Sequence, residues 1–229
     1  MSELFSIQLQ NRQQQGRDGV WLDLPTTTEQ VQAALRQIGI SSDNPQGLFI
    51  SGYFAEEEKR FAIPYNMVLA SNVDELNFLA SRLETLSTGE RAELNAALQA
   101  PQSELFSIGR ITDFPENVDY YVHLPDVHGP AQLGDYYLNR SGMVDMPEEW
   151  KGGIDTAQFG RYVAQQEQGA FTQYGYLVKS GDEWQKVHEG QPVPEEYRVL
   201  SFPAPEVLRD AANIPPPVQP ETEPQKVIP

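Results

Sequence analysis

A short stretch of the sequence holds side chains that could bind a metal ion. His123, Asp126 and His128 lie within six residues of one another, and imidazole and carboxylate groups are common metal ligands. Pro125 lies within the stretch, and Gly129 and Pro130 follow it directly, so no helix can place the three side chains on one face. A metal-dependent hydrolase that uses these three residues is therefore the least favoured of the functions considered.

Two adjacent carboxylates, Glu148 and Glu149, could act as a general acid and a general base. They follow Pro147, however, and acidic residues in that position are typical of the first turn of a helix, where they interact with the helix dipole. The sequence contains no cysteine, and it has neither a glycine-rich phosphate loop after a strand nor a nucleophile elbow. We therefore predict a protein that is not an enzyme and that uses no metal and no cofactor.

Negative charge is the most informative feature of the composition. The chain has 33 acidic and 16 basic residues, which gives a net charge of −17 and an isoelectric point near 4.4. The largest excess lies in residues 102–202, with sixteen acidic and seven basic residues. Such a field repels nucleic acid and anionic lipids and attracts basic protein surfaces, although acidity can also serve solubility alone.

Aromatic residues are concentrated between Leu133 and Val178, where acidic residues are interleaved with them and cations are few. We expect these carboxylates, and two that precede them, to face water or a cationic partner. The predicted acidic surface consists of Asp119, Asp126, Asp135, Asp145, Glu148, Glu149, Asp155 and Glu167. The apolar side chains of residues 136–150 exceed what one small domain can bury, which predicts an interface between two copies of the chain. Its predicted residues are Tyr136, Tyr137, Met143, Met146 and Trp150.

The pattern of apolar residues predicts an α+β fold, built as an elongated chain of three small domains. Strands at Phe5–Leu9, Val20–Leu24 and Leu48–Phe54, with a helix that Thr26 caps before the third strand, predict a ββαβ N-terminal domain over residues 1–65. An N-cap at Asn72, with Asp74 and Glu75 in the first turn, and a capping box at Ser87 open two helices, which predict a helical middle domain over residues 66–102.

The remaining sequence predicts an α+β C-terminal domain over residues 103–202. Its expected elements are a strand at Tyr120–His123, helices that start at Pro130 and after Asp155, and a hairpin of Phe171–Lys179 with Glu183–His188. Residues 203–229 hold eight prolines in 27 positions, which predicts a disordered tail.

The order of these motifs resembles that of the ArdA antirestriction proteins. The run LGDYYLNRSGMVDMPEEWKGGIDTAQFGRYVAQQEQGAFTQYGYLV, preceded by Tyr120-Tyr121 and Asp126, resembles the C-terminal domain of that family. The segment GVWLDLPTTTEQVQAALRQIGI resembles the family's opening, where a W-[LI]-D-L strand precedes a helix. The resemblance covers about residues 4–180 and places the family's antirestriction motif on about Gly134–Trp150.

The resemblance implies an elongated three-domain protein, carried on mobile genetic elements, that forms a homodimer through its C-terminal domain. Its surface carboxylates would imitate the phosphates of bent B-form DNA, and it would inhibit Type I restriction–modification enzymes by occupying their DNA-binding groove. B-form DNA carries one charge per ~1.7 Å of axis, so a mimic needs dozens of carboxylates on an extended body. The alternative is an acidic module of the same fold that binds a different basic protein.

The sequence also predicts where the protein works. No apolar run approaches the roughly 18 residues that a membrane helix needs, and no signal peptide is recognisable at Met1. The absence of cysteine fits a reducing compartment. We therefore expect a cytoplasmic protein that binds neither membrane nor nucleic acid.

Overall fold

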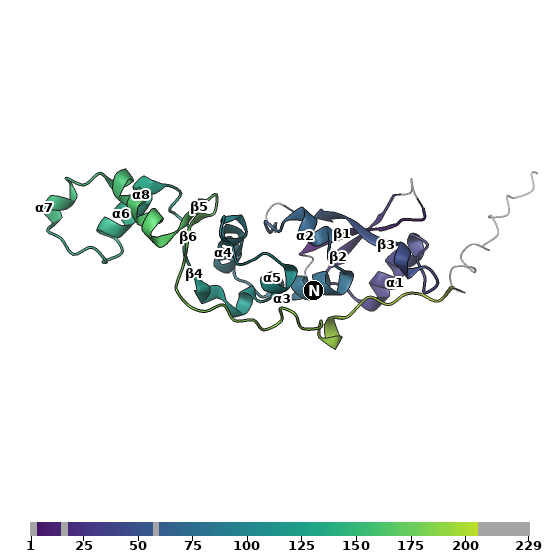
Figure 1. Ribbon diagram of the computed structural model, residues 1–229. Coiled ribbons are helices and arrows are strands. Elements are labelled where there is room, and N and C mark those ends of the chain that lie inside the picture. The colour runs from purple at the N-terminus through teal and green to yellow at the C-terminus, as the bar shows by residue number, and fades with distance from the viewer. Residues whose placement is uncertain (1–3, 15–17, 57–59, 206–229) are drawn as a thin grey trace, which may run out of the picture.

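The structure is a computed structural model that describes residues 4–14, 18–56 and 60–205. Within these residues the chain forms an elongated body with two small antiparallel sheets placed apart along its long axis (Figure 1). The predicted mixture of helices and antiparallel strands is confirmed. The predicted disordered tail lies outside the described residues, apart from its first three positions.

The N-terminal sheet has the strand order β2-β1-β3, with both pairs antiparallel. Its formation follows from the sequence pattern, because the apolar residues Phe5, Ile7 and Leu9 alternate along the first strand and are all buried. Helix α1 presents Val31 and Leu35 to the same core. The elements are β1 (Phe5–Asn11), β2 (Val20–Leu24), α1 (Thr28–Gln37), the short η1 turn (Pro45–Gly47) and β3 (Leu48–Phe54).

Four helices form the middle of the body. Both predicted helix caps are confirmed: Ser87 forms the expected capping box with Glu90, and Asn72 caps the preceding helix and also forms a capping box, with Glu75. The helices are α2 (Tyr65–Leu69), α3 (Val73–Glu84), α4 (Thr88–Gln99) and α5 (Ile108–Thr112), followed by the turns η3 (Phe114–Glu116) and η4 (Val118–Tyr120).

The second sheet has the order β4-β6-β5 and carries a helical lobe at the far end of the body (Figure 1). We call residues 125–169 the distal lobe. The predicted helix cap at Asp155 is confirmed, because its carboxylate accepts a hydrogen bond from the Gln158 N–H at 3.0 Å. The elements are β4 (Tyr121–Leu124), α6 (Pro130–Asn139), α7 (Glu148–Lys151), α8 (Thr156–Glu167), β5 (Ala170–Thr172) and β6 (Gly175–Lys179).

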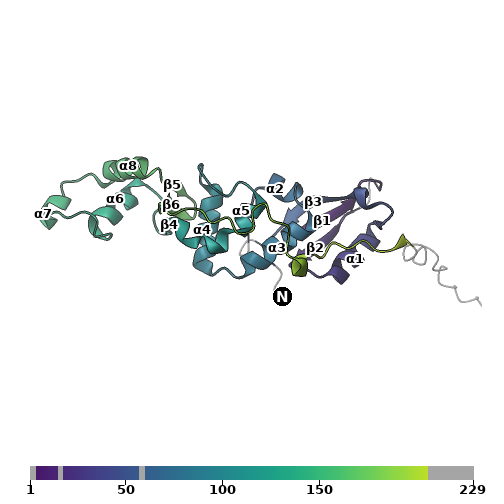
Figure 2. The ribbon, with the colours of Figure 1, turned by 60° about the horizontal axis from the view of Figure 1, so that its bottom comes forward.

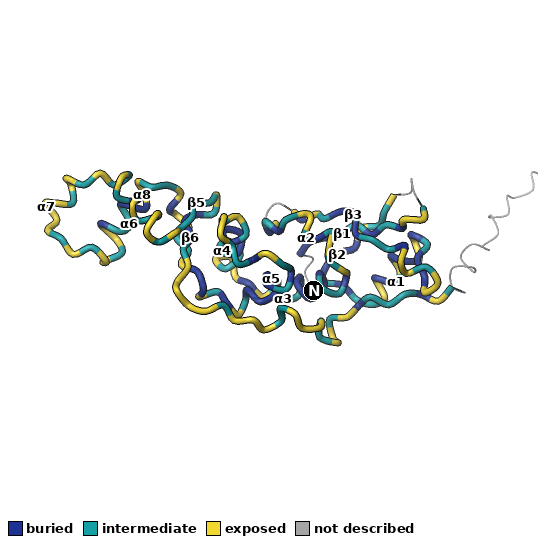
Figure 3. The backbone as a smooth tube through the Cα atoms, viewed as in Figure 1, coloured by how far each residue is buried: buried dark blue, intermediate teal, exposed yellow. Residues whose placement is uncertain are grey.

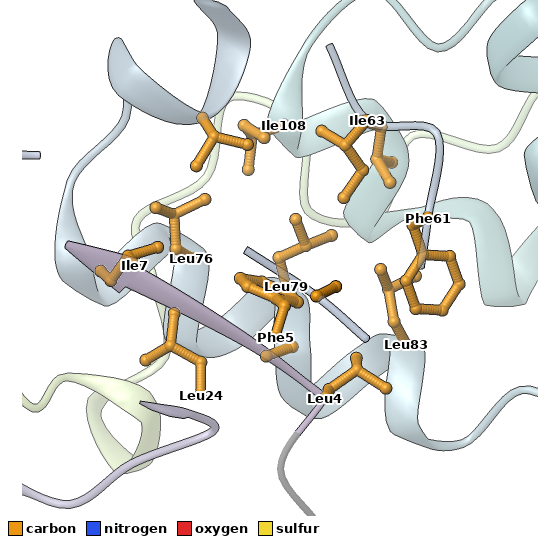
Figure 4. Packing of buried hydrophobic residues seen from close by; sticks show 14 of the residues in the cluster. Leu4, Phe5, Ile7, Leu24, Phe61, Ile63, Leu76, Leu79, Leu83 and Ile108 are labelled. Atoms are coloured by element: carbon orange, nitrogen blue, oxygen red, sulfur yellow. The ribbon is translucent and has the colours of Figure 1, made fainter. Parts of the chain in front are cut away.

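One buried cluster unites most of the body. It joins Leu4 and Phe5 of the N-terminal sheet to Leu76 and Leu79 of α3 (Figure 4) and includes Leu177 of the second sheet. Buried backbone segments recur along the length of the body (Figure 3). A smaller cluster around Val127, Leu133 and Tyr176 holds the distal lobe. The three-domain layout stays a prediction, and the large cluster runs without a break past residues 65 and 102.

A long segment returns along the body after β6, past α5 and α3 toward α1 (Figures 1 and 2). We call residues 180–205 the strap; it contains the short 3-10 helix η5 (Glu195–Tyr197). The predicted strand at Glu183–His188 is wrong, because side chains of the body bind its backbone instead. The Gln185 N–H donates to Asn117 Oδ1 at 2.7 Å and the His188 N–H donates to Asp113 Oδ1 at 2.6 Å. The observed hairpin joins β5 to β6, inside the predicted Phe171–Lys179 strand.

Helices α6 and α8 pack unusually closely, because each contributes a glycine to the contact. A Cβ atom on Gly160 would overlap the carbonyl oxygen of Pro130, and one on Gly134 would overlap that of Thr156. Backbone atoms cannot move aside as a flexible side chain can. The separation of the two helices is therefore set by these glycines.

We expect Gly160→Ala to destabilise the protein by about 1–3 kcal/mol, because the added methyl group forces α6 and α8 apart. Urea unfolding and hydrogen exchange within α6 and α8 would measure the effect. Gly89→Ala in α4 is the matched control: apart from its chain neighbours and the backbone of its own helix, no atom lies within 4 Å of the added Cβ, and the change should be neutral or stabilising by up to ~1 kcal/mol. Equal stabilities for the two variants would contradict the steric argument.

Candidate protein-binding surface

Four of the eight predicted acidic residues are fully available to a partner. Asp119 lies on η4, Asp126 follows β4, and Asp145 and Glu149 lie beside or within α7. All four are exposed, and within the described residues none accepts a hydrogen bond or forms an ion pair. Their negative charge is therefore not offset locally.

Two further predicted residues share their charge with a neighbouring cation. Asp135 lies 3.1 Å from Arg140, and Glu148 lies 2.9 Å from Lys151. Exposed ion pairs of this kind contribute little to stability, usually below about 1 kcal/mol. They do, however, reduce the net charge that these two carboxylates present.

The last two predicted residues have structural roles. Asp155 caps α8, as described above. Glu167 is partly buried and accepts hydrogen bonds from the hydroxyls of Tyr137 at 2.5 Å and Tyr176 at 3.0 Å. Burial, and then the adjacent Glu167 carboxylate, raises the pKa of both hydroxyls, so both remain protonated donors. Glu167 thus holds the distal lobe together and offers less charge than the sequence predicted.

The sequence prediction missed exposed carboxylates elsewhere on the body. They occur near turn-forming residues, as in Asp43-Asn-Pro, Ser-Gly-Asp182-Glu183 and Pro-Glu195-Glu196, and that turn chemistry is a signal that could have identified them. With Asp18 in the loop before β2 and Asp23 on β2, they extend the exposed negative charge over the length of the described chain.

Glu93 of α4 lies in a neighbourhood of like charge. Its Oε1 atom is buried and has no hydrogen-bond partner in the part of the chain that the structure describes. Burial, followed by the nearby carboxylates of Glu90 and Asp119, raises the pKa of Glu93 to about 8 from its ordinary value of 4.5. The folded protein therefore favours the protonated form of this side chain.

We expect Glu93→Gln to raise the melting temperature at pH 8. Because the folded pKa is about 8 and the unfolded value is near 4.5, the unsubstituted protein loses stability as the pH rises through this interval. The amide stays neutral, so its advantage should grow from pH 5 to pH 8 and vanish near pH 4.5. Thermal unfolding at several pH values would measure it, with Glu149→Gln as the exposed control. A difference that does not vary with pH would contradict the argument.

The geometry does not support a metal site at the histidines. His123 Nε2 lies 2.7 Å from the carbonyl oxygen of Tyr174; since a carbonyl only accepts, this nitrogen donates and has no free lone pair for a metal. Among the described residues, no group of three or more ligand-type side chains could hold a metal ion.

The predicted interface residues differ in how available they are. Met143 and Trp150 are the most exposed, at 74% and 65%, and both lie at the end of the distal lobe. Tyr136 and Tyr137 are half-buried against the lobe's core, with their rings edge to face 5.5 Å apart. Met146 is also half-buried. Tyr162 of α8, 60% exposed, is a further aromatic residue that the prediction omitted.

Fold and surface together define an elongated, acidic α+β protein that displays unpaired carboxylates. Comparison with protein families makes this specific: the model of the antirestriction protein (ArdA) family matches residues 15–178. The chain therefore belongs to this family, as the sequence resemblance predicted, and membership implies an antirestriction function directed at restriction enzymes. The match includes every predicted acidic and interface residue and ends before the strap. A comparison with curated proteins found no match.

No helix in the described ranges is long and apolar enough to cross a membrane.

Proposed function

We propose that the protein inhibits a Type I restriction–modification enzyme by occupying its DNA-binding groove, with surface carboxylates in place of DNA phosphates. The observation that carries this proposal is the set of exposed, unpaired carboxylates on an elongated body. Membership of the antirestriction family supports it. DNA-binding grooves present lysine and arginine to the phosphate backbone, so they complement such a surface.

Unpaired carboxylates suit this role better than paired ones, because binding need not first break a local ion pair. We therefore assign the main contacts to Asp119, Asp126, Asp145 and Glu149. Asp135, Glu148 and Asp155 are exposed or partly exposed but already bound within the chain, so they contribute less. Glu167 has mainly a structural role, because it accepts hydrogen bonds from Tyr137 and Tyr176 and so fixes their positions.

The proposed active form is a cytoplasmic homodimer joined through the distal lobes, with Met143 and Trp150 in the contact and the neighbouring carboxylates of Asp145 and Glu149 at its rim, where they stay accessible to the enzyme. A second copy doubles both the length of the body and the number of carboxylates. Both are needed to match the charge of a DNA segment, which carries one negative charge per ~1.7 Å. The inhibition is stoichiometric and involves no catalytic step.

A competition experiment tests the proposal. A labelled duplex that carries the recognition sequence is bound to the purified restriction–modification enzyme, and the protein is added at 50 and at 200 mM salt. We expect displacement of the duplex, and an apparent inhibition constant that rises by ~10-fold or more between the two salt concentrations. Unlabelled duplex used as the competitor is the control for the salt response of the groove itself.

Three outcomes would contradict the proposal. If the protein binds the enzyme while the duplex stays bound, the groove is not its site. If affinity is unchanged between the two salt concentrations, charge does not drive the binding. Absence of any binding, together with unchanged restriction of an incoming plasmid in vivo, would favour the alternative of an acidic module directed at another basic protein.

A further inference from the structure

We infer that the strap is an intramolecular brace that fixes the N-terminal sheet relative to the second sheet, with Asp113 and Asp74 as the positioning residues that hold it. The strap lies beyond the segment that matches the family model, whereas all of its anchors lie within that segment. The inference concerns the geometry of the free protein and goes beyond the proposed function.

The first anchor lies next to α5. The Asp113 carboxylate is fully buried and accepts hydrogen bonds from the backbone N–H groups of His188 at 2.6 Å and Glu189 at 3.2 Å. Asn117 binds Gln185 twice, donating to its carbonyl at 2.9 Å and accepting from its N–H at 2.7 Å. A buried carboxylate is costly unless its oxygens are satisfied. The strap supplies both donors, so releasing it would remove both hydrogen bonds from the Asp113 carboxylate.

An ion-pair network reinforces this anchor. The nearly buried guanidinium of Arg110 binds Glu189 of the strap at 3.1 Å and Glu104 at 2.8 Å. Glu104 also binds Lys179, the last residue of β6, at 2.7 Å. The place where the strap leaves the second sheet is thereby connected to its first contact with the helices.

The second anchor lies at the N-terminus of α3. Asp74 Oδ1 accepts hydrogen bonds from the backbone N–H groups of Val199 and Leu200, both at 2.7 Å. Asn77 donates to the Tyr197 carbonyl at 3.0 Å, while its own Oδ1 accepts from the Thr26 N–H at 2.7 Å. One asparagine therefore binds both the strap and the connection between β2 and α1.

The strap ends against the N-terminal sheet's own helix and loop. Gln32 of α1 donates to the Ser201 hydroxyl at 3.1 Å, and the Ser42 N–H donates to the Pro203 carbonyl at 3.0 Å. Between the first and second anchors the strap borders an open groove of about 710 Å³, lined by Phe78, Ile108 and others. The strap is thus held at separate points along its length, as a brace is.

We expect the strap to pre-organise the elongated body for binding to a partner. An elongated body that bends freely would lose more conformational entropy on binding than one whose ends are already fixed. This consequence for inhibition rests on the proposed function, but the bracing itself does not.

Distance measurements between two spin labels test the brace in the full chain. The sequence contains no cysteine, so Gln37→Cys in α1 and Gln173→Cys in the β5–β6 turn, both exposed, provide the only labelling sites. We expect a narrow distance distribution in this labelled protein. Asp74→Ala should broaden it by about 2-fold or more and should speed amide exchange at Val199 and Leu200.

Two control variants distinguish loss of the strap's anchor from a general effect of removing charge or lowering stability. Asp74→Asn removes the same charge but keeps Oδ1 as an acceptor, so the distribution should stay narrow. Asp43→Ala removes an exposed carboxylate that accepts no hydrogen bond from the strap, and it should also leave the distribution unchanged. Circular dichroism checks that each variant folds, and Asp74→Ala is preferred to Asp113→Ala because Asp113 is fully buried.

Two results would overturn the inference. If Asp74→Ala leaves amide exchange at Val199 and Leu200 unchanged, Asp74 does not hold the strap. If exchange rises but the distance distribution stays narrow, the strap is held there but does not brace the body. Neither readout involves a restriction enzyme, so failure here is distinct from failure of the proposed function.

Discussion

Replacing Asp119, Asp126, Asp145 and Glu149 together by their amides is expected to weaken inhibition of the restriction enzyme by about 100-fold. Each exposed carboxylate contributes up to about 1 kcal/mol in a screened surface field, and well-separated contributions add. Single substitutions should therefore cost less than about 5-fold each. The measurement is the competition assay together with restriction of an incoming plasmid in vivo, and circular dichroism should show an unchanged fold.

A charge-preserving variant is the matched control for this result. Changing the three aspartates to glutamate and Glu149 to aspartate keeps four carboxylates at slightly different positions. A distributed charge surface should tolerate this exchange, whereas a site of fixed geometry should not. Complete loss of activity from any one amide substitution, with the fold preserved, would point to a discrete site, because removal of one essential group then abolishes function.

Met143→Asp is expected to convert a dimer into a monomer. In a twofold contact the new carboxylate enters the interface twice, and burial of unpaired charge is strongly unfavourable. We expect the dissociation constant to rise by at least about 100-fold, equivalent to ~3 kcal/mol, with a similar but smaller effect for the half-buried Met146. Sedimentation at micromolar concentration would measure both.

The control for this experiment is Gln166→Asp, which adds the same charge at an exposed position of α8 in the same lobe. It should leave the assembly unchanged if the contact is centred on Met143 and Trp150. An unsubstituted protein that sediments as a monomer at micromolar concentration would contradict the predicted dimer itself.

Local sequence signals predicted the secondary structure well where local interactions decide it. The Val20–Leu24 strand and the caps at Asn72, Ser87 and Asp155 all formed as expected. The cap of α1 shifted by one residue, from Thr26 to Thr27, which pairs with Gln30. Thr26 is buried, and its N–H donates to the distant Asn77. This tertiary contact therefore decides which of the three adjacent threonines caps the helix.

Contacts between distant residues explain what the sequence could not predict. The Glu183–His188 strand failed because Asp113 and Asn117, about 70 positions earlier, satisfy its backbone groups. Glu167 looked like a surface acid, and only the folded lobe brings the Tyr137 hydroxyl to it. For the carboxylates, sequence identified the residue types, but which of them are paired depends on side-chain positions such as that of Arg140.

The placement of the strap gives the body a stiffness that depends on direction. The strap follows one side of the long axis and is fastened at several points from the second sheet to α1 (Figures 1 and 2). When the body bends so that the strap lies on the convex side, the anchors move apart and the strap is stretched. When the strap lies on the concave side, the anchors approach one another and the strap is not under tension. Thermal bending should therefore favour curvature toward the strap, and a groove that demands the opposite curvature should bind the protein less tightly.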